Sequence, residues 1–388
     1  MSNPSAGAPP QFSLDDGQVA VRDMARAFAD EIFAPNAIAW DAAKHFPVAA
    51  MRQAAALGMA GIYVAEDFGG SGLSRLDAAL IFEALATGCP AVAAYMSIHN
   101  MVAWMIDAYG SDAQRRKWLP PLCKMESFAS YCLTEPDAGS DAAALKTRAV
   151  RDGDCYVLNG QKLFISGAGV SDLYAVMART GGKGAGGIST FLVPGDAAGI
   201  SFGADERKMG WNAQPTRAVG FADVRVPAGN RLGDEGMGFR IAMAGLDGGR
   251  LNIAACSLGG AEAALEKSLR YMKERRAFGK RLDEFQALQF RLADMATELE
   301  AARTFVWRAA AALDRKQANA AVLCAMAKRF VTDACFEIAN AALQLHGGYG
   351  YLAEFGIEKI VRDLRVHQIL EGTNEIMRLI VARSLVGR

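Results

Sequence analysis

The stretch FASYCLTEPDAGSD, residues 128–141, marks the point where this chain changes from helix to strand. Before it, apolar residues recur at helical spacing. After it, short β-rich runs alternate with turn residues. The stretch itself is an extended run that leads into a polar turn containing Pro136 and Gly139, and such a turn exposes backbone N–H groups and hydroxyls to a ligand. Taken alone, an ordinary exit from a strand into a loop explains it equally well.

Upstream of this stretch, the apolar periodicity predicts helices with one glycine-rich loop between them. The helices are expected at residues 15–33, 46–57, 76–86, 92–109 and 112–122, and the loop at 67–72. Residues 84–106 contain no Asp, Glu, Lys or Arg and are long enough to span a bilayer. Because Pro90 interrupts this stretch, we predict two buried helical pieces and no membrane association.

Downstream, the runs at residues 129–133, 156–162, 173–179, 189–193 and 218–226 predict strands, separated by turn clusters such as 151–154 and 181–187. No helical segment separates these runs, which favours an antiparallel sheet or barrel. Helical spacing returns at residues 238–272, 285–312, 319–345, 356–370 and 373–385. The predicted layout is therefore α–β–α, an α+β fold, with bundle packing and burial between subunits in the last part.

Composition excludes several classes of function. The 42 Lys and Arg balance 42 Asp and Glu, whereas a nucleic-acid-binding protein needs a basic excess. The four histidines share no ligand spacing and the seven cysteines form no C-x-x-C pair, so we expect no metal site and a reducing compartment. The first ten residues have neither the charge nor the apolar run of a signal or transit peptide. A bacterial cytoplasm is expected, or the mitochondrial matrix if an organellar leader has been trimmed.

Four further stretches carry residue types suited to binding or catalysis. They are 162–167 (KLFISG), 275–280 (RRAFGK) followed by Phe285 and Gln286, 344–351 (QLHGGYGY), and 369–378 (ILEGTNEIMR). The first places Phe164 and Ser166 two apart on one strand, the second supplies Arg for a pyrophosphate, and the third ends a helix in two glycines. When each stands alone, core packing is the better explanation of the first stretch, a solvated helix end is a common explanation of the second, and a simple helix cap explains the third.

The last of these stretches contains the candidate catalytic residue. Glu371 ends an apolar run and precedes Gly372, and Thr373 opens the next helix. A carboxylate placed there can sit in a desolvated pocket, where its pKa rises toward that of a useful general base. A solvated glutamate in a linker is the competing interpretation if the motif is taken alone.

Together and in this order, these stretches resemble the acyl-CoA dehydrogenase family from about residue 12 to the end. The resemblance implies an N-terminal helical domain (1–127), a middle β-barrel or sheet domain (128–234) and a C-terminal four-helix bundle (235–388). It also implies FAD, a homotetramer built as a dimer of dimers, and electron-transfer flavoprotein as the acceptor. Glu371 matches the family's catalytic base, which removes the proton α to a thioester carbonyl before a hydride passes to flavin N5.

The same resemblance implies the binding residues. FAD contacts are expected from Tyr131, Cys132, Leu133, Thr134, Gly139, Ser140, Phe164, Ile165, Ser166, Thr373, Asn374 and Glu375. Further FAD contacts, reaching the cofactor of a neighbouring subunit, are expected from Arg275, Phe278, Phe285, Gln286, Gln344, Leu345, His346, Gly347 and Gly348. Acyl-CoA contacts are expected from Ser140, Asp247, Gly248, Gly249, Arg250, Gly372 and Arg383.

Within the family, segments such as 97–101 (SIHNM), 210–219 (GWNAQPTRAV) and 362–372 (RDLRVHQILEG) resemble members that oxidise isobutyryl-CoA to methacrylyl-CoA in valine breakdown. Gly249 occupies the position where isovaleryl-type members carry their base, and no Arg lies in 91–101 to pair with a dicarboxylic chain. A preference for 2-methylbutyryl-CoA or butyryl-CoA, an oxidase, and a non-catalytic flavoprotein scaffold are the alternatives.

Overall fold

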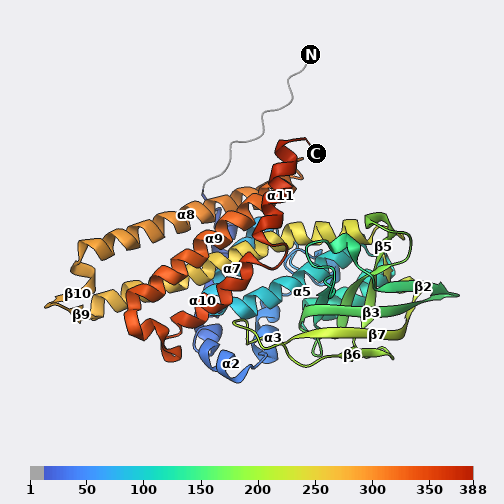
Figure 1. The fold of residues 1–388 in the computed structure, drawn as a ribbon, viewed down its shortest axis with the longest axis horizontal. Coiled ribbons are helices and arrows are strands. Elements are labelled where there is room, and N and C mark those ends of the chain that lie inside the picture. The colour runs from blue at the N-terminus through green and yellow to red at the C-terminus, as the bar shows by residue number, and fades with distance from the viewer. Residues whose placement is uncertain (1–12, 388) are drawn as a thin grey trace, which may run out of the picture.

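The computed structural model describes residues 13–387, and its N-terminal part is helical as predicted (Figure 1). Three of these helices begin with a capping box, in which a side chain and a backbone N–H three residues apart bond reciprocally, at Asp15, Ser74 and Ser111. A π-helical turn over Ala29–Phe33 extends the first helix. The helices are α1 (Asp16–Phe28), α2 (Ala37–Ala43), α3 (Val48–Ala56), α4 (Arg75–Gly88), α5 (Pro90–Tyr109) and α6 (Asp112–Cys123), of which α2 was not predicted.

The uncharged stretch 84–106 lies in the protein core. Cys89 separates α4 from α5, and Pro90 occupies the first turn of α5, where its missing N–H costs nothing. Nearly all side chains of both helices are buried. Among the described residues, no helix is long and apolar enough to cross a membrane.

The middle part is one eight-stranded sheet. Its strands are β1 (Ala129–Cys132), β2 (Arg148–Asp152), β3 (Cys155–Ser166), β4 (Leu173–Arg179), β5 (Ile188–Pro194), β6 (Ile200–Phe202), β7 (Thr216–Pro227) and β8 (Arg231–Leu232). The order is β6-β7-β3-β2-β4-β5-β8, with β1 paired to β4. The glycine-rich segment 181–187 is the connection between the antiparallel strands β4 and β5. Strands β2, β6 and β8 were not predicted.

The prediction of a purely antiparallel sheet was wrong in two places. Strand β1 runs parallel to β4 along its whole length, and β2 meets β4 in parallel at one residue pair. The remaining pairings are antiparallel. Strand order and direction are tertiary properties that short runs of residues do not encode.

The C-terminal part contains the three long helices α7 (Gly238–Glu274), α8 (Gln286–Asp314) and α9 (Ala320–His346), followed by α10 (Ile357–Arg365) and α11 (Asn374–Leu385). A hairpin of β9 (Arg276–Ala277) and β10 (Lys280–Arg281) joins α7 to α8. Figure 1 shows this hairpin at one end of the long axis and the sheet at the other. The predicted helix 356–370 ends early, because Val366–Gln368 tightens into a 3₁₀ turn.

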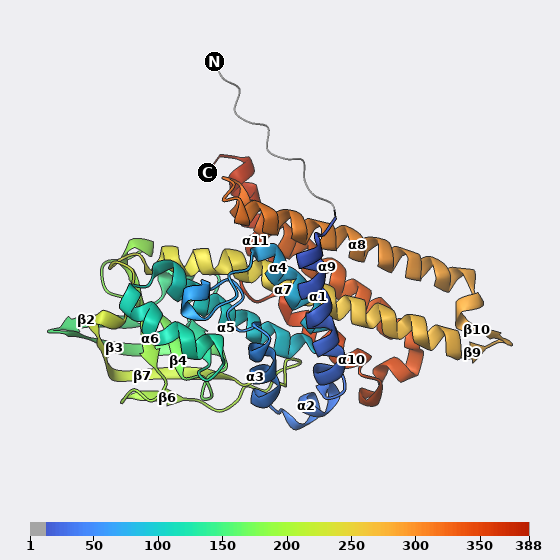
Figure 2. The same ribbon diagram turned by 180° about the vertical axis from the view of Figure 1, so that it is seen from behind.

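Helix α7 is the central element of the molecule. Its small residues allow close approach: a Cβ added at Gly259 would lie 2.0 Å from the carbonyl oxygen of Glu83 on α4. One apolar core contains residues of α4, α5, α7 and α9. Figure 2 shows α1 packed on this assembly from behind. The N-terminal and C-terminal helices therefore share a core, although the sheet separates them in sequence.

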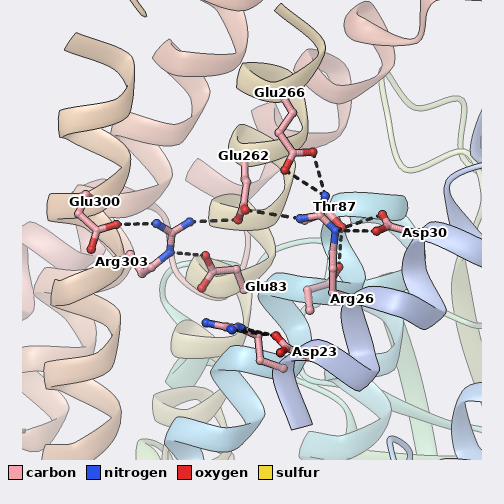
Figure 3. A network of polar contacts seen from close by, with 11 residues as sticks. Asp23, Arg26, Asp30, Glu83, Thr87, Glu262, Glu266, Glu300 and Arg303 are labelled. Carbon is pink, nitrogen blue, oxygen red and sulfur yellow. Dashed lines mark hydrogen bonds and ion pairs between the residues drawn. The ribbon is translucent and has the colours of Figure 1, made fainter. Parts of the chain in front are cut away.

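A partly buried ionic network also ties these helices together (Figure 3). Arg303 of α8 donates to Glu83 of α4 at 2.7 Å, to Glu262 of α7 at 3.0 Å and to Glu300 of α8 at 2.6 Å. Arg26 of α1 donates to the other oxygen of Glu262 at 3.4 Å. Four helices thus converge on two guanidinium groups.

Candidate active site

Glu371 lies in the short connection between α10 and α11, and its backbone conformation is unusual. It has a φ of +54°, and Gly372 follows with a φ of +94°. A non-glycine residue in the left-handed region is disfavoured and persists only where its surroundings hold it. Gly372 could not be replaced easily, because its φ of +94° is one that residues with a Cβ rarely adopt. Thr373 then caps α11, accepting a hydrogen bond from the N–H of Ile376.

The carboxylate of Glu371 is buried and has no hydrogen-bond partner among the described residues. Burial raises its pKa to about 7, against the opposing charges of Lys328 and Arg250. A buried acid is usually hydrogen-bonded, so both the missing partner and the shifted pKa mark this group as functional. The carboxylate is therefore desolvated, and its pKa lies near neutral pH. Neither of its oxygens is engaged by another described residue, so both could accept a proton from a substrate.

Helix α7 forms the wall opposite this carboxylate. A Cβ added at Gly249 would lie 2.4 Å from Oε2 of Glu371 and 3.1 Å from Sδ of Met101 on α5. Glycine is therefore required at this point of α7 if Glu371 is to keep its position. The structure brings predicted residues Gly249 and Glu371 together and adds Met101, which the sequence gave no reason to select.

Arg250 links α7 to the Glu371 loop. Its Nε donates to the backbone carbonyl of Glu371 at 3.3 Å, and its Nη1 donates to Asp247 at 2.7 Å. Both predicted acyl-CoA residues therefore lie beside the loop. Arg383, also predicted, is exposed on α11. Within residues 13–387 it makes no hydrogen bond to the loop that carries Glu371.

Three residues beside Gly248 were missed. Arg75, at the start of α4, is buried, and its guanidinium lies 4.1 Å from the ring centroid of Tyr63 and 4.5 Å from that of Trp104. A Cβ at Gly248 would lie 2.2 Å from Nη1 of Arg75. These residues come from separate segments and no local pattern connects them, so only the tertiary structure could identify them.

The turn after β1 is fixed by a buried ion pair. Lys162 of β3 donates to Glu135 at 2.7 Å and to the carbonyl of Leu133 at 3.0 Å. Glu135 in turn accepts the backbone N–H of Thr147 at 3.0 Å. This brace holds Thr134, whose side chain is partly exposed, while Gly139 and Ser140 are exposed, with open space around Gly139.

The end of β3 departs from the expected regular alternation. Its pairing with β7 shifts register between Lys162 and Ile165, and Phe164 has a φ of +57°. Phe164 is 63 % exposed, whereas Ile165 is buried in the sheet core. The argument that Phe164 and Ser166 share a face by simple alternation therefore fails here, because a bulge interrupts the repeat. Cys132 and Leu133 also bury their side chains, leaving only their backbone for a ligand.

A second group of predicted residues surrounds a separate cavity of about 530 Å³. Its lining includes Arg275, Gln344, Leu345, His346, Gly347 and Gly348. The last two glycines have open space around them, so a ligand can approach the backbone. Phe285 and Gln286 begin α8 nearby, and Phe278 at the hairpin tip is 95 % exposed.

The two predicted groups are not brought together within one chain. The cavity lies where α7 ends and α9 ends, next to the β9–β10 hairpin. The sheet that carries Tyr131 and Phe164 lies at the opposite end of the molecule (Figure 1). Among the described residues, no group of His, Cys, Asp or Glu could hold a metal ion, and every cysteine is unpaired.

Comparison with known proteins gives full-length matches. Residues 15–126, 130–224 and 236–386 match the N-terminal, middle and C-terminal domains of acyl-CoA dehydrogenase. "Isobutyryl-CoA dehydrogenase, mitochondrial" of Bos taurus is 56% identical over 377 residues, covering 97% of this chain and 91% of that protein. "Acyl-CoA dehydrogenase, short-chain specific" of Clostridium acetobutylicum is 40% identical, covering 96% of this chain and 99% of that one.

Solved structures agree with these matches. Butyryl-CoA dehydrogenase from Megasphaera elsdenii superposes with a TM-score of 0.94 at 38% identity, covering 97% of this chain and 100% of that one. A glutaryl-CoA dehydrogenase in complex with glutaryl-CoA gives 0.95 at 35% identity, with 97% of each chain covered. The arrangement of helices and sheet described above is thus shared with both.

Proposed function

The chain belongs to the acyl-CoA dehydrogenase family, and we propose that it oxidises isobutyryl-CoA to methacrylyl-CoA with Glu371 as the base that removes the α proton. The observation that carries this proposal is the buried, unpartnered carboxylate of Glu371 with a pKa raised to about 7. The α C–H of a thioester is a weak acid, so its removal needs a base of suitable pKa and stabilisation of the developing enolate.

Glu371 supplies more than its carboxylate. Its backbone N–H makes no hydrogen bond with any residue in the range 13–387, so it remains available to a substrate carbonyl oxygen. Because Gly249 stands against Oε2, the base and this donor present a fixed geometry to a bound thioester. Burial excludes water, which would otherwise solvate the carboxylate and lower its basicity.

FAD is the cofactor of this family, and the residues present fit it. Open space around Gly139, Gly347 and Gly348, the exposed ring of Phe164 and the guanidinium of Arg275 supply backbone, stacking and phosphate contacts of the kind FAD needs. The side of the site that faces the flavin ring would be completed by Thr134, Ser166, Thr373 and Glu375. The side that holds the pyrophosphate and adenosine would be completed by Gln344. The chemistry supplied by bound FAD is acceptance of a hydride from the substrate β-carbon.

We further propose a homotetramer in which each cofactor is held by two copies. Support comes from the separation of the two predicted groups of contacts within one chain, which an adjoining copy would reunite. Electron-transfer flavoprotein is proposed as the acceptor. The division at 1–127, 128–234 and 235–388 is likewise proposed, supported by the change from helix to sheet and back.

The preference for isobutyryl-CoA rests on similarity and on the shape of the site. A relative that is 56% identical carries that name, while one at 40% is named short-chain specific. Gly248 lies against Arg75, and Gly249 lies against Glu371 and Met101, so a branch on the acyl chain has to fit beside these side chains. A single methylene is worth only about 1–3 kcal/mol of discrimination, so 2-methylbutyryl-CoA and butyryl-CoA are the competing substrates.

The test is anaerobic mixing of the FAD-loaded protein with isobutyryl-CoA, 2-methylbutyryl-CoA, butyryl-CoA and glutaryl-CoA while flavin bleaching is followed. We expect fastest bleaching by isobutyryl-CoA, and slow or absent bleaching by glutaryl-CoA. Fastest bleaching by another chain would change the substrate and keep the mechanism. Absence of bleaching by every thioester would refute the enzymatic proposal, and rapid peroxide formation in air would identify an oxidase.

A further inference from the structure

Lys328 of α9 is a buried amine that the proposed chemistry does not yet use. It is fully buried, yet it makes no ion pair with any carboxylate in the described part of the chain. Its Nζ donates instead to the carbonyl oxygen of Gly372 at 2.8 Å and to Oδ1 of Asn374 at 2.9 Å. Unpaired buried lysines are rare because desolvation of an ammonium is costly, so this one requires a reason.

Both acceptors of Lys328 lie immediately after Glu371. Gly372 is the next residue, and Asn374 is the first residue of α11. Thr332, one turn along α9, accepts a hydrogen bond from Asn374 at 3.0 Å and donates to the carbonyl of Lys328 at 2.8 Å. Helix α9 therefore fixes the part of the connection that follows Glu371 in the chain.

Helix α7 fixes the connection at Glu371 itself. Arg250 donates to the carbonyl oxygen of Glu371, while Lys328 donates to the carbonyl oxygen of the following residue. The two successive residues that carry positive φ, Glu371 and Gly372, are thus each held by one cation. A disfavoured backbone conformation persists where surrounding contacts determine it, and these two contacts do so here.

The direction of the Lys328 bonds leaves the carboxylate unoccupied. A direct ion pair would occupy the oxygen atoms that must accept the substrate proton and would depress the pKa strongly. The ammonium donates its hydrogen bonds to a backbone carbonyl and a side-chain amide. Its positive charge therefore acts on the Glu371 carboxylate without a hydrogen bond between the two groups. Burial lowers the pKa of Lys328 to about 8, with the charge of Glu371 opposing this shift.

We propose that Lys328 is a positioning residue for the catalytic base, holding the Glu371–Asn374 connection in its active conformation and supplying a positive charge that favours the carboxylate form. This inference rests on the proposed role of Glu371. It extends that role by assigning the balance of charge at the base to a residue whose ammonium donates to the connection itself and not to the carboxylate.

Several other groups face this pair and enter its titration. Those close enough to act electrostatically on Glu371 or Lys328, or to be acted on by them, are Tyr63, Tyr131, Arg250, Cys256, Asp333, His367 and Glu375. Burial raises the pKa values of both tyrosines and of Cys256 and lowers that of His367 to about 3, so all four are neutral near pH 7. Near pH 7 these four groups add no charge that changes with pH. Glu371 and Lys328 therefore titrate as a coupled pair, and the apparent pKa values belong to both groups together.

The decisive variant is Lys328→Met, which keeps the length of the side chain and removes both charge and donor. Infrared spectroscopy of the FAD-loaded protein follows the C=O stretch of protonated Glu371, identified by its loss in Glu371→Gln. We expect the band to persist to a pH higher by about one unit or more than in the wild type. The acid limb of kcat/KM should move upward by the same amount, and the plateau should fall roughly ten-fold as the loop loosens.

Two further variants separate charge from hydrogen bonding and from folding. Lys328→Arg keeps the charge and should hold the limb near its wild-type position. Lys328→Gln, neutral but still a donor, should shift it upward and serves if the methionine variant does not fold. Lys359→Met is the matched control: Lys359 is buried against Asp363 at 2.7 Å, so its loss should lower thermal stability and leave the Glu371 band unmoved.

The infrared titration gives an answer whether or not isobutyryl-CoA is the substrate. A Glu371 band that titrates at the same pH in the wild type and in both neutral Lys328 variants would overturn the proposal. So would an equal shift in Lys359→Met, because the effect would then be a general consequence of losing a buried amine. Failure of the wild type to bleach with any acyl-CoA would instead count against the proposed reaction alone.

Discussion

Oε2 of Glu371 lies so close to Gly249 that a β-carbon on that glycine would stand 2.4 Å from it. The relationship joins helix α7 to the connection between α10 and α11, more than a hundred residues further along the chain, and fixes where the proposed base can be. It also makes the site sensitive to the smallest possible side chain.

Gly249→Ala should displace the Glu371 carboxylate with little change in the rest of α7, since alanine is a better helix former than glycine. A displacement of about 1 Å costs on the order of 10²-fold in rate, so we expect kcat to fall by that order. Stopped-flow flavin reduction measures this. Gly182→Ala, where the added Cβ meets nothing within 4 Å, is the control and should behave as the wild type.

Glu371→Gln should retain FAD and the fold while losing proton abstraction. The amide is isosteric but cannot accept the α proton, and loss of a general base typically costs about 10²–10⁴-fold. Anaerobic flavin reduction by isobutyryl-CoA, with visible absorbance as the check on bound FAD, provides the measurement. Normal reduction in this variant would remove Glu371 from the mechanism.

The pH dependence of the wild type follows from the raised pKa of Glu371, about 7. The carboxylate is the active form, so kcat/KM should fall about ten-fold for each pH unit below that value and level off above it. An acid limb near the ordinary glutamate pKa would mean that the base is solvated when the substrate binds. Initial rates across a buffer series with constant ionic strength decide between these outcomes.

Lys162→Met should release the turn that carries Thr134 and lower FAD retention. Burial opposes ionisation of Glu135, yet the Lys162 ammonium and the backbone N–H donors keep its pKa below the ordinary value. Removing one partner of a buried pair costs roughly 3–5 kcal/mol, so the thermal midpoint should drop as well. FAD content after gel filtration is the measurement.

Two controls test this interpretation. Lys146→Met removes the exposed partner of Asp137 in the same turn, at 2.8 Å, and should change neither FAD content nor stability. Combining Lys162→Met with Glu135→Gln should recover part of the loss, because no uncompensated charge remains. If Lys146→Met and Lys162→Met lost FAD and stability equally, burial of the Lys162–Glu135 pair would not be the reason that this pair holds the turn.

Arg303→Met should destabilise the helical assembly, because Glu83 would lose its buried counter-charge (Figure 3). Burial already raises the pKa of Glu83 to about 7, so this group binds a proton in the folded state while it is ionised in the unfolded chain. Its contribution to stability is therefore lost as pH rises from about 4.5 to about 7. The loss in Arg303→Met should approach roughly 3–5 kcal/mol above that window and shrink toward pH 5.

Urea unfolding at both ends of the pH window checks this prediction. Glu300→Gln, which removes a partner whose side chain is 64% exposed, should have little effect at either pH. A pH-independent loss in Arg303→Met would mean that packing, and not the charge of Glu83, dominates at this site.

The sequence by itself determined most of the long elements and led to the proposal that Glu371 is the base. A β-rich run between turn residues placed β4 at its observed bounds, and apolar periodicity located the long helices α7, α8 and α9 within a few residues, because the helical period repeats many times in each. The motif Glu371-Gly372-Thr373 pointed to a base only together with the other stretches, because a solvated linker glutamate explains it when it stands alone. Strand β6 was missed because its 3 residues carry too little signal, and α2 was missed although its 7 residues make it as long as β4.

Only the tertiary structure decided the surroundings of the proposed base. Its pKa depends on burial beneath α7, and its backbone conformation depends on Arg250 and Lys328, which approach from two different helices. The parallel pairing of β1 with β4 and the stacking of Arg75 between Tyr63 and Trp104 are of the same kind. These features arise from contacts between segments distant in sequence, and desolvation and electrostatics depend on distance in space, which no local pattern of residues records.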